Sequence, residues 1–158
     1  MKMTKAKNES GRTMLEMLGV LAIMGVIMYG AIAGIGFGVD MYKINATFND
    51  VEELSQGVID LFSWNAGGYP ETSFKQAIQG NDLVDLQICN SGASTSACFV
   101  SRFGSQINVT PCPARDCSKF EIAISGLPYL AVQRLKNMTY ANMTVTSTDD
   151  GSLTLTSK

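Results

Sequence analysis

An apolar run near the N-terminus constrains this chain more than any other feature. From Met17 to Val39 the sequence contains no Asp, Glu, Lys or Arg. Such a run is longer than the roughly 20 helical residues that cross a hydrocarbon core of about 30 Å. It begins directly after Glu16 and ends directly before Asp40. The segment is therefore a removable signal, a permanent membrane anchor, or a helix that also packs against copies of itself.

The charges on the two sides of this run differ in sign. Residues 1–11 carry Lys2, Lys5 and Lys7 against Glu9, a charge of +2, and the whole chain carries −2, so the remainder carries −4. A basic leader before an apolar segment favours a leader that stays in the cytoplasm and a C-terminal part that is exported. The acidic balance of the exported part argues against strong binding of nucleic acid.

Four cysteines lie in the exported part, at Cys89, Cys98, Cys112 and Cys117. An even number in an exported domain favours two disulfides over free thiols. A zinc site is less favoured, because the cysteines are not closely paired and the chain has no histidine. Three connectivities are possible, and we prefer Cys89–Cys98 and Cys112–Cys117 because each pair encloses a predicted turn. Each bridge would then add about 2–3 kcal/mol of stability.

The boundary between the leader and the apolar run carries a helix-start pattern. Thr13 and Glu16 form T-x-x-E, a capping box in which a hydroxyl and a carboxylate satisfy free backbone N–H groups. No small-residue cleavage site of a secretory signal precedes Asp40. A carboxylate at the edge of an apolar segment is costly in lipid and marks a functional residue that needs a partner. A cut after Gly11 would give Arg12 a terminal ammonium group, which could pair with Glu16 of a neighbouring copy.

The segment Gly11–Glu16, G-R-T-M-L-E, resembles the processing motif of type IV prepilins and of the related type II secretion pseudopilins. In that family a prepilin peptidase cuts after a glycine, and a glutamate stands five residues into the mature chain. The resemblance implies a cut between Gly11 and Arg12, assembly roles for Glu16 and Thr13, and methylation of the new N-terminus. Arg12 stands where the family usually has Phe, Met or Leu.

The same resemblance implies partners and a location. The chain would enter the bacterial inner membrane as a single-pass precursor with its head in the periplasm, and would then join an extracellular pilus. Its partners would be copies of itself in a helical filament, the prepilin peptidase and the pilus assembly platform in the inner membrane. A type II secretion pseudopilin is the alternative within the family. A single-span exported binding module that never polymerises is the alternative from a different class.

Three glycines in the apolar run, Gly30, Gly34 and Gly38, repeat at every fourth residue. Such a stripe allows helices to approach closely in a membrane or a filament core. Glycine is also generally common in membrane helices, so both interpretations stay open. Because each glycine costs a helix about 1 kcal/mol relative to alanine, we predict that the helix bends or stretches here in an assembly.

From Asp40 onward the sequence becomes amphipathic, with apolar residues at spacings of three and four. They are Met41, Ile44, Phe48, Val51, Val58 and Phe62, with Ser55 occupying the position between Val51 and Val58. Asp50 is expected on the opposite, polar face. One helix is therefore predicted over residues 13–64. The chain divides into a leader (1–11), an apolar membrane or filament-core helix (12–39), an amphipathic half (40–64) and a globular head (65–158).

The head shows short alternating segments. Strands are predicted at 106–109 and 120–124, and a hairpin at 143–146 and 152–156 around the turn Asp149–Gly151. Short helices are predicted at 73–79 and 128–136, the second with Leu130 and Leu135 pointing inward and Val132 as a further candidate. The predicted fold class is α+β, a long N-terminal helix packed on a small antiparallel sheet.

Several common catalytic arrangements are missing from this chain. It has no histidine for a Ser-His or Cys-His site and no phosphate-binding loop, and its carboxylates lack metal-ligand spacing. The acidic pair at Asp149 and Asp150 is explained more simply by a hairpin turn than by a cation. We therefore predict a protein that is not an enzyme and has no cofactor, no metal and no small-molecule substrate.

Overall fold

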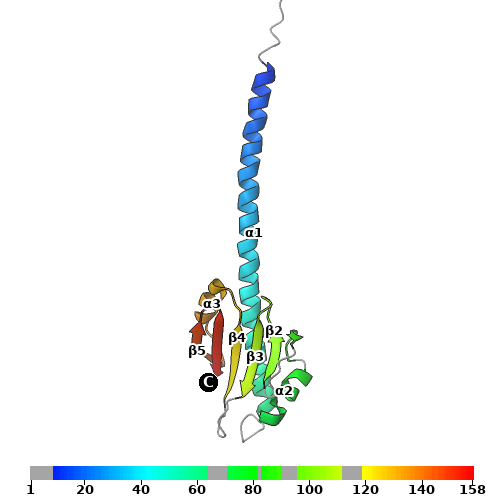
Figure 1. Ribbon diagram of the computed structural model, residues 1–158, viewed down its shortest axis with the longest axis vertical. Coiled ribbons are helices and arrows are strands. Elements are labelled where there is room, and N and C mark those ends of the chain that lie inside the picture. The colour runs from blue at the N-terminus through cyan, green and yellow to red at the C-terminus, as the bar shows by residue number, and fades with distance from the viewer. Residues whose placement is uncertain (1–8, 64–70, 82, 90–95, 112–118) are drawn as a thin grey trace, which may run out of the picture. The chain divides into compact units, whose positions relative to one another are not determined.

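The computed structural model describes residues 9–63, 71–81, 83–89, 96–111 and 119–158 (Figure 1). The chain forms two compact units, Met1–Met41 and Tyr42–Lys158. Helix α1 (Glu9–Phe62) contributes its first part to one unit and its last part to the other. The second unit, Tyr42–Lys158, is called the head below.

In the first unit, no other described part of the chain covers the side chains of α1. All the residues from Met14 to Asp40 are exposed, although nearly all of them are apolar. By length and composition, Met14–Phe62 qualifies as a membrane-crossing helix, with a most apolar window of mean hydropathy 2.2 that is not buried. The predicted helix start at Thr13 is wrong, because α1 already begins at Glu9. The first turn of α1 therefore includes residues 9–11 of the predicted leader.

The described part of the head contains two further helices and six strands (Figure 1). The helices are α2 (Glu71–Gly80) and α3 (Tyr129–Lys136). The strands are β1 (Gln87–Ile88), β2 (Ala97–Val100), β3 (Gln106–Pro111), β4 (Phe120–Ser125), β5 (Met143–Asp149) and β6 (Ser152–Ser157). The predicted α+β class, a long N-terminal helix with a small antiparallel sheet, is confirmed.

All six strands belong to one sheet, in the order β1-β2-β3-β4-β6-β5, and every neighbouring pair is antiparallel. Strand β6 lies between β4 and β5, so the chain crosses from β4 to the far edge through α3 before it returns. A bulge between Val145 and Ser147 interrupts the pairing of the edge strand β5. Bulges of this kind limit pairing of an edge strand with other chains.

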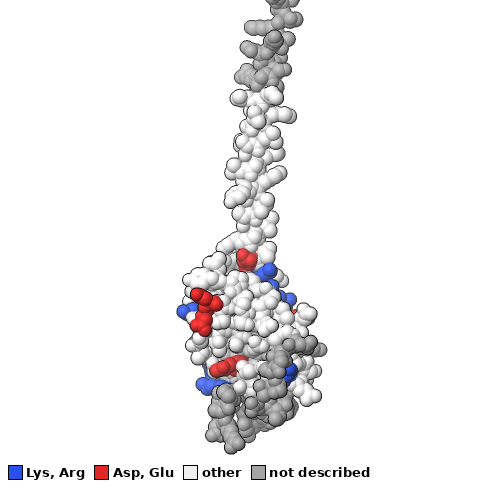
Figure 2. All heavy atoms as spheres, in the orientation of Figure 1, with Lys and Arg blue, Asp and Glu red and all other residues white. Residues whose placement is uncertain are grey.

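The core of the head lies between α1 and one face of the sheet. Alternate residues of β3, β4 and β6 are buried and face this core, as the period of two requires. Helix α1 contributes Ile44, Val51, Leu54 and Val58, all at most 2 % exposed. The other face of the sheet carries mainly small polar residues, and Figure 2 shows a head surface with few charged side chains.

The structure differs from the predictions in the orientation of two side chains, and it contains one strand that was not predicted. Leu130 was expected inside, but it is 69 % exposed, because α3 buries Ala131, Val132 and Leu135 instead. Asp50 was expected on the exposed face of α1, but it is only 6 % exposed. Strand β2 was not predicted, since Ala97, Cys98 and Phe99 are all buried and give no alternating pattern.

Candidate assembly site

The processing and assembly residues predicted from the sequence lie together at the start of α1. Gly11, Arg12 and Thr13 have helical backbone, and their side chains lie outside the described part of the structure. Thr13 lies inside helix α1, which begins at Glu9, rather than at the N-cap position that a capping box requires. A cut after Gly11 would return Thr13 to the first turn.

Glu16 is exposed and lies on an apolar stretch of α1. A shallow groove along this stretch is lined by Glu16 together with Met14, Met17, Val20 and Leu21. Among the described residues Glu16 has no ion-pair partner. If lipid or protein covers this stretch, the carboxylate loses its water and needs a positively charged or hydrogen-bonding partner.

The apolar surface of α1 is large and uncovered. Met14, Leu15, Ile32 and Ile35 are each 67–75 % exposed. Burial of each such side chain would be worth about 1.5–3 kcal/mol. Soluble monomers rarely expose a continuous apolar surface of this extent, which marks a membrane or protein interaction site.

The glycine stripe lies on this uncovered part of α1. A Cβ atom added at Gly30, Gly34 or Gly38 would meet no atom within 4 Å. The single chain therefore gives no packing reason for glycine at these positions. The backbone stays helical throughout the stripe, so the predicted bend is absent from the single chain and remains a prediction for an assembly.

The predicted disulfide between Cys89 and Cys98 is present, with the two Cα atoms 5.3 Å apart. The backbone N–H of Cys89 also donates a hydrogen bond to the carbonyl of Cys98 at 3.1 Å. The bridge therefore ties the residue after β1 to strand β2 inside the sheet. The other predicted pair, Cys112–Cys117, lies outside the described residues.

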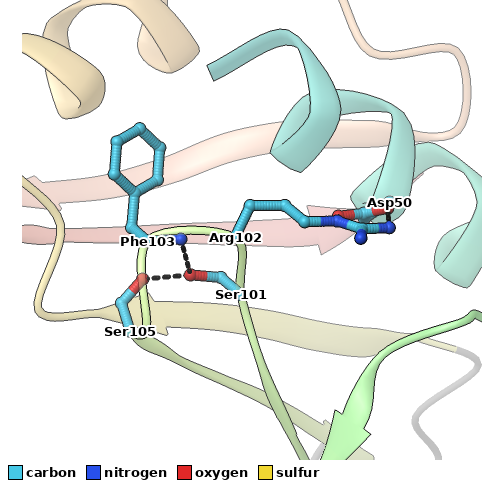
Figure 3. Close-up of polar contacts among 5 residues, drawn as sticks. All are labelled: Asp50, Ser101, Arg102, Phe103 and Ser105. Atoms are coloured by element: carbon cyan, nitrogen blue, oxygen red, sulfur yellow. Dashed lines mark hydrogen bonds and ion pairs between the residues drawn. The ribbon is translucent and has the colours of Figure 1, made fainter. Parts of the chain in front are cut away.

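The turn between β2 and β3 is held by its own hydrogen bonds (Figure 3). The hydroxyl groups of Ser101 and Ser105 are hydrogen-bonded to each other, and the N–H of Phe103 donates to the Ser101 hydroxyl at 3.2 Å. Gly104 adopts the left-handed conformation with φ +77°, which favours glycine.

This turn is attached to α1 by charged side chains that the sequence analysis did not connect. Arg102 donates two hydrogen bonds to the Asp50 carboxylate, from Nε at 3.0 Å and from Nη2 at 3.1 Å (Figure 3). These hydrogen bonds and the charge of Asp50 raise the pKa of the Arg102 guanidinium. The ammonium group of Lys43 lies 5.7 Å from the centre of the Phe103 ring.

A second polar contact joins α1 to the residues before β5. The N–H of Ala141 donates to the Glu52 carboxylate at 2.9 Å, and the Asn142 amide donates to Gln56 at 2.7 Å. Tyr140 is buried beside these groups and donates its hydroxyl hydrogen to the carbonyl of Leu135 at 3.1 Å. Burial, and to a lesser degree the charge of Glu52, raise the pKa of Tyr140.

The acidic pair of the β5–β6 turn has a structural explanation. Gly151 adopts φ +87°, and its carbonyl accepts hydrogen bonds from the N–H groups of Gly126 and Leu127. Within the described residues no group of three or more metal-ligating side chains is found. Asp149 is the last residue of β5, Asp150 lies in the turn, and both are exposed.

No protein-family model and no curated protein sequence matches the chain. A crystal structure of type IV b pilin from Salmonella typhi is similar to it, with a TM-score of 0.50 and 16 % sequence identity. The match covers 72 % of this chain and 97 % of that chain. At this sequence identity the structural match establishes similarity of fold alone. Together with the long helix and the antiparallel sheet described above, it leads to one conclusion: this chain has a type IV pilin-like fold.

Proposed function

We propose that this chain is the structural subunit of a type IV pilus-like surface filament. One observation carries the proposal: a head with a pilin-like fold is continuous with an apolar helix. The side chains of this apolar stretch are uncovered, and it begins directly after one carboxylate, Glu16. Such a helix is insoluble by itself, so it requires lipid before assembly and other protein helices afterwards.

The proposed sequence of events follows the order of the motifs. The basic leader stays in the cytoplasm while the apolar helix holds the precursor in the bacterial inner membrane with its head in the periplasm. A prepilin peptidase then cuts after Gly11, which creates a positively charged N-terminus at Arg12. An assembly platform in the inner membrane next moves the subunit into the extracellular filament.

In the filament, the positive N-terminus of one copy would pair with Glu16 of its neighbour. The pair gives the carboxylate the partner that it needs in an apolar environment, and it aligns successive copies along the axis. Thr13 would lie in the first turn of the mature helix. Gly30, Gly34 and Gly38 would allow neighbouring helices to approach closely, which is consistent with the open space beside them in the single chain.

The variant Glu16→Ala tests this proposal. We expect it to be inserted and cut but to yield few surface filaments, because the N-terminus of the neighbour loses its partner. Glu9→Ala removes the same group from the leader, which is lost on cleavage, and is the matched control with filament yield unchanged. A Glu16→Ala chain that is cut and assembles at the wild-type level would contradict the assignment.

The alternatives predict different results for the wild-type chain. A chain that loses its leader but forms no surface fibres would favour a secretion pseudopilin. A chain that is never cut and stays monomeric in the membrane would favour a single-span binding module and would overturn the proposal.

A further inference from the structure

Helix α3 exposes an apolar and a basic side chain on the same flank. Leu130 is 69 % exposed, and Arg134, one helical turn further along, is also exposed. The buried face of the helix is formed by Ala131, Val132 and Leu135. Leu130 is apolar but lies on the side of α3 away from the buried face, and nothing in the described head covers it.

Arg134 lacks a charged partner in a single copy. Within the described residues it forms no ion pair, and the first turn of α3 contains no acidic residue. Lys136 is the other basic residue of the last turn, but at 100° per residue it points away from Arg134 to the opposite flank. The exposed flank of α3 therefore has an apolar group and a positive charge about 6 Å apart along the helix axis.

The end of the apolar part of α1 has the complementary pattern. Gly36 has no side chain, and a Cβ atom added there would meet no atom within 4 Å, so a neighbouring side chain can approach the backbone of α1 at this position. Asp40 is the first charged residue after the apolar run, is exposed, and forms no ion pair among the described residues. Gly36 and Asp40 are one turn apart, which is the same spacing as that of Leu130 and Arg134.

We propose that α3 of one copy packs on the Gly36–Asp40 turn of α1 in a second copy, with Leu130 over Gly36 and Arg134 paired with Asp40. The inference rests on the proposed function, because it requires copies that lie side by side. Small residues at a helix contact allow close approach of a neighbouring side chain. Lipid would also cover Leu130, but a second copy supplies both a position without a side chain, Gly36, and the opposite charge of Asp40 one turn away.

This contact would link the head of one subunit to the helix of another, in addition to contacts between the helices themselves. It would restrict the rotation of the head relative to its neighbour, because the ion pair and the apolar contact fix two points. Removal of one partner of a buried ion pair leaves the other charge unpaired, which is costly.

A charge exchange in the full-length chain tests the pair. Arg134→Asp and Asp40→Arg are each expected to lower the yield of sheared filaments roughly tenfold, because each places like charges in contact. The double variant is expected to recover to within about twofold of wild type, because it restores an opposite pair. Lys136→Asp makes the same charge change on the opposite flank of α3 and is expected to assemble normally.

A cross-link tests the geometry independently of yield. A chain carrying both Leu130→Cys and Gly36→Cys is expected to form disulfide-linked dimers and longer ladders under oxidation. A chain carrying Tyr129→Cys and Gly36→Cys is the matched control, because Tyr129 is exposed but lies about 100° away around α3. Little cross-linking is expected for this control.

The outcomes separate this contact from the proposed function. Two results would overturn the contact alone, provided that the wild-type chain forms filaments. One is normal assembly of both single charge variants, and the other is equal cross-linking of the two cysteine pairs. Absence of filaments from the wild-type chain would overturn both proposals. Recovery by the double variant together with selective cross-linking of the first pair would support the contact.

Discussion

Arg102 and Asp50 are 52 positions apart in the sequence and form a two-pronged ion pair in the head. The Asp50 side chain is 8 % exposed, and that of Arg102 is 43 % exposed. The planar guanidinium meets both oxygens of the carboxylate, which a lysine ammonium cannot do in the same way. The pair fastens the β2–β3 turn to the part of α1 that forms the spine of the head.

Removal of Arg102 tests the importance of this pair for the head. Arg102→Ala leaves the Asp50 carboxylate buried without its donors, so we expect the melting temperature of the head to fall by roughly 4 °C or more. Arg102→Lys should recover only part of the loss, because it cannot make the two-pronged contact. Arg134→Ala is the control, since Arg134 has no ion pair among the described residues. Equal melting temperatures for Arg102→Ala and the control would show that the pair contributes little.

The Arg102–Asp50 pair is an example of a contact that the sequence did not predict. The spacing of apolar residues identified α1 and its buried stripe, because that signal is local and repeats over many turns. It placed Asp50 among the exposed residues, since the burial of this carboxylate depends on Arg102 in a distant turn. Strand β2 was missed for a related reason: Ala97, Cys98 and Phe99 are all buried, so the expected alternation is absent.

The buried face of helix α3 was also not fully predicted from the sequence. Its sequence has four apolar residues in the first seven positions after Pro128, and more than one face can be chosen as the buried one. The structure buries the small Ala131 and leaves Leu130 in solvent. The resemblance to a processing motif could be recognised because its residues are contiguous from Gly11 to Glu16. A partner for Glu16 was expected on a neighbouring copy, and a single chain does not test that prediction.

Two leucines in α3 provide a direct test of that orientation. Leu135→Ala removes a fully buried side chain and should lower the free energy of unfolding by about 2–5 kcal/mol. Leu130→Ala removes an exposed one and should change it by no more than about 0.5 kcal/mol. Denaturant unfolding of the two variants in parallel measures both values. A larger loss for Leu130→Ala than for Leu135→Ala would mean that α3 is rotated relative to this structure.

The Cys89–Cys98 bridge should contribute to the stability of the head. The bridge closes a short loop and so restricts the unfolded chain. Replacement of both residues by serine removes this restriction, and we expect the free energy of unfolding to fall by about 2–3 kcal/mol. Chemical denaturation of the variant and of wild type under oxidising conditions measures this loss. A reducing agent should then lower the stability of wild type further than that of the variant. If the two proteins responded equally to reduction, this bridge would not be the source of the effect.

Tyr140 should make the head sensitive to alkaline pH. Its pKa is raised by burial in the folded state, whereas an unfolded tyrosine titrates near pH 10. Above about pH 10 the unfolded chain therefore loses a proton that the folded chain keeps, and stability should fall by up to about 1.4 kcal/mol per pH unit. Below pH 10 both states are protonated and the contribution is fully present.

The variant Tyr140→Phe isolates this effect. It should be less stable than wild type at neutral pH by about 0.5–1.5 kcal/mol, because the hydrogen bond to the Leu135 carbonyl is lost. Its stability should nevertheless decline less steeply above pH 10, as measured by unfolding at a series of pH values. Tyr129→Phe changes an exposed phenol and should retain the wild-type slope. An unchanged slope in Tyr140→Phe would assign the alkaline sensitivity to other groups.

Cleavage after Gly11 and assembly into filaments are tested together by the intact mass of the chain in fibres sheared from the cell surface. We expect such fibres to contain this protein as a chain that begins at Arg12 and lacks residues 1–11, with or without one methyl group on its terminus. Recovery of the protein only as the full-length chain, monomeric in the membrane and absent from sheared material, would contradict it.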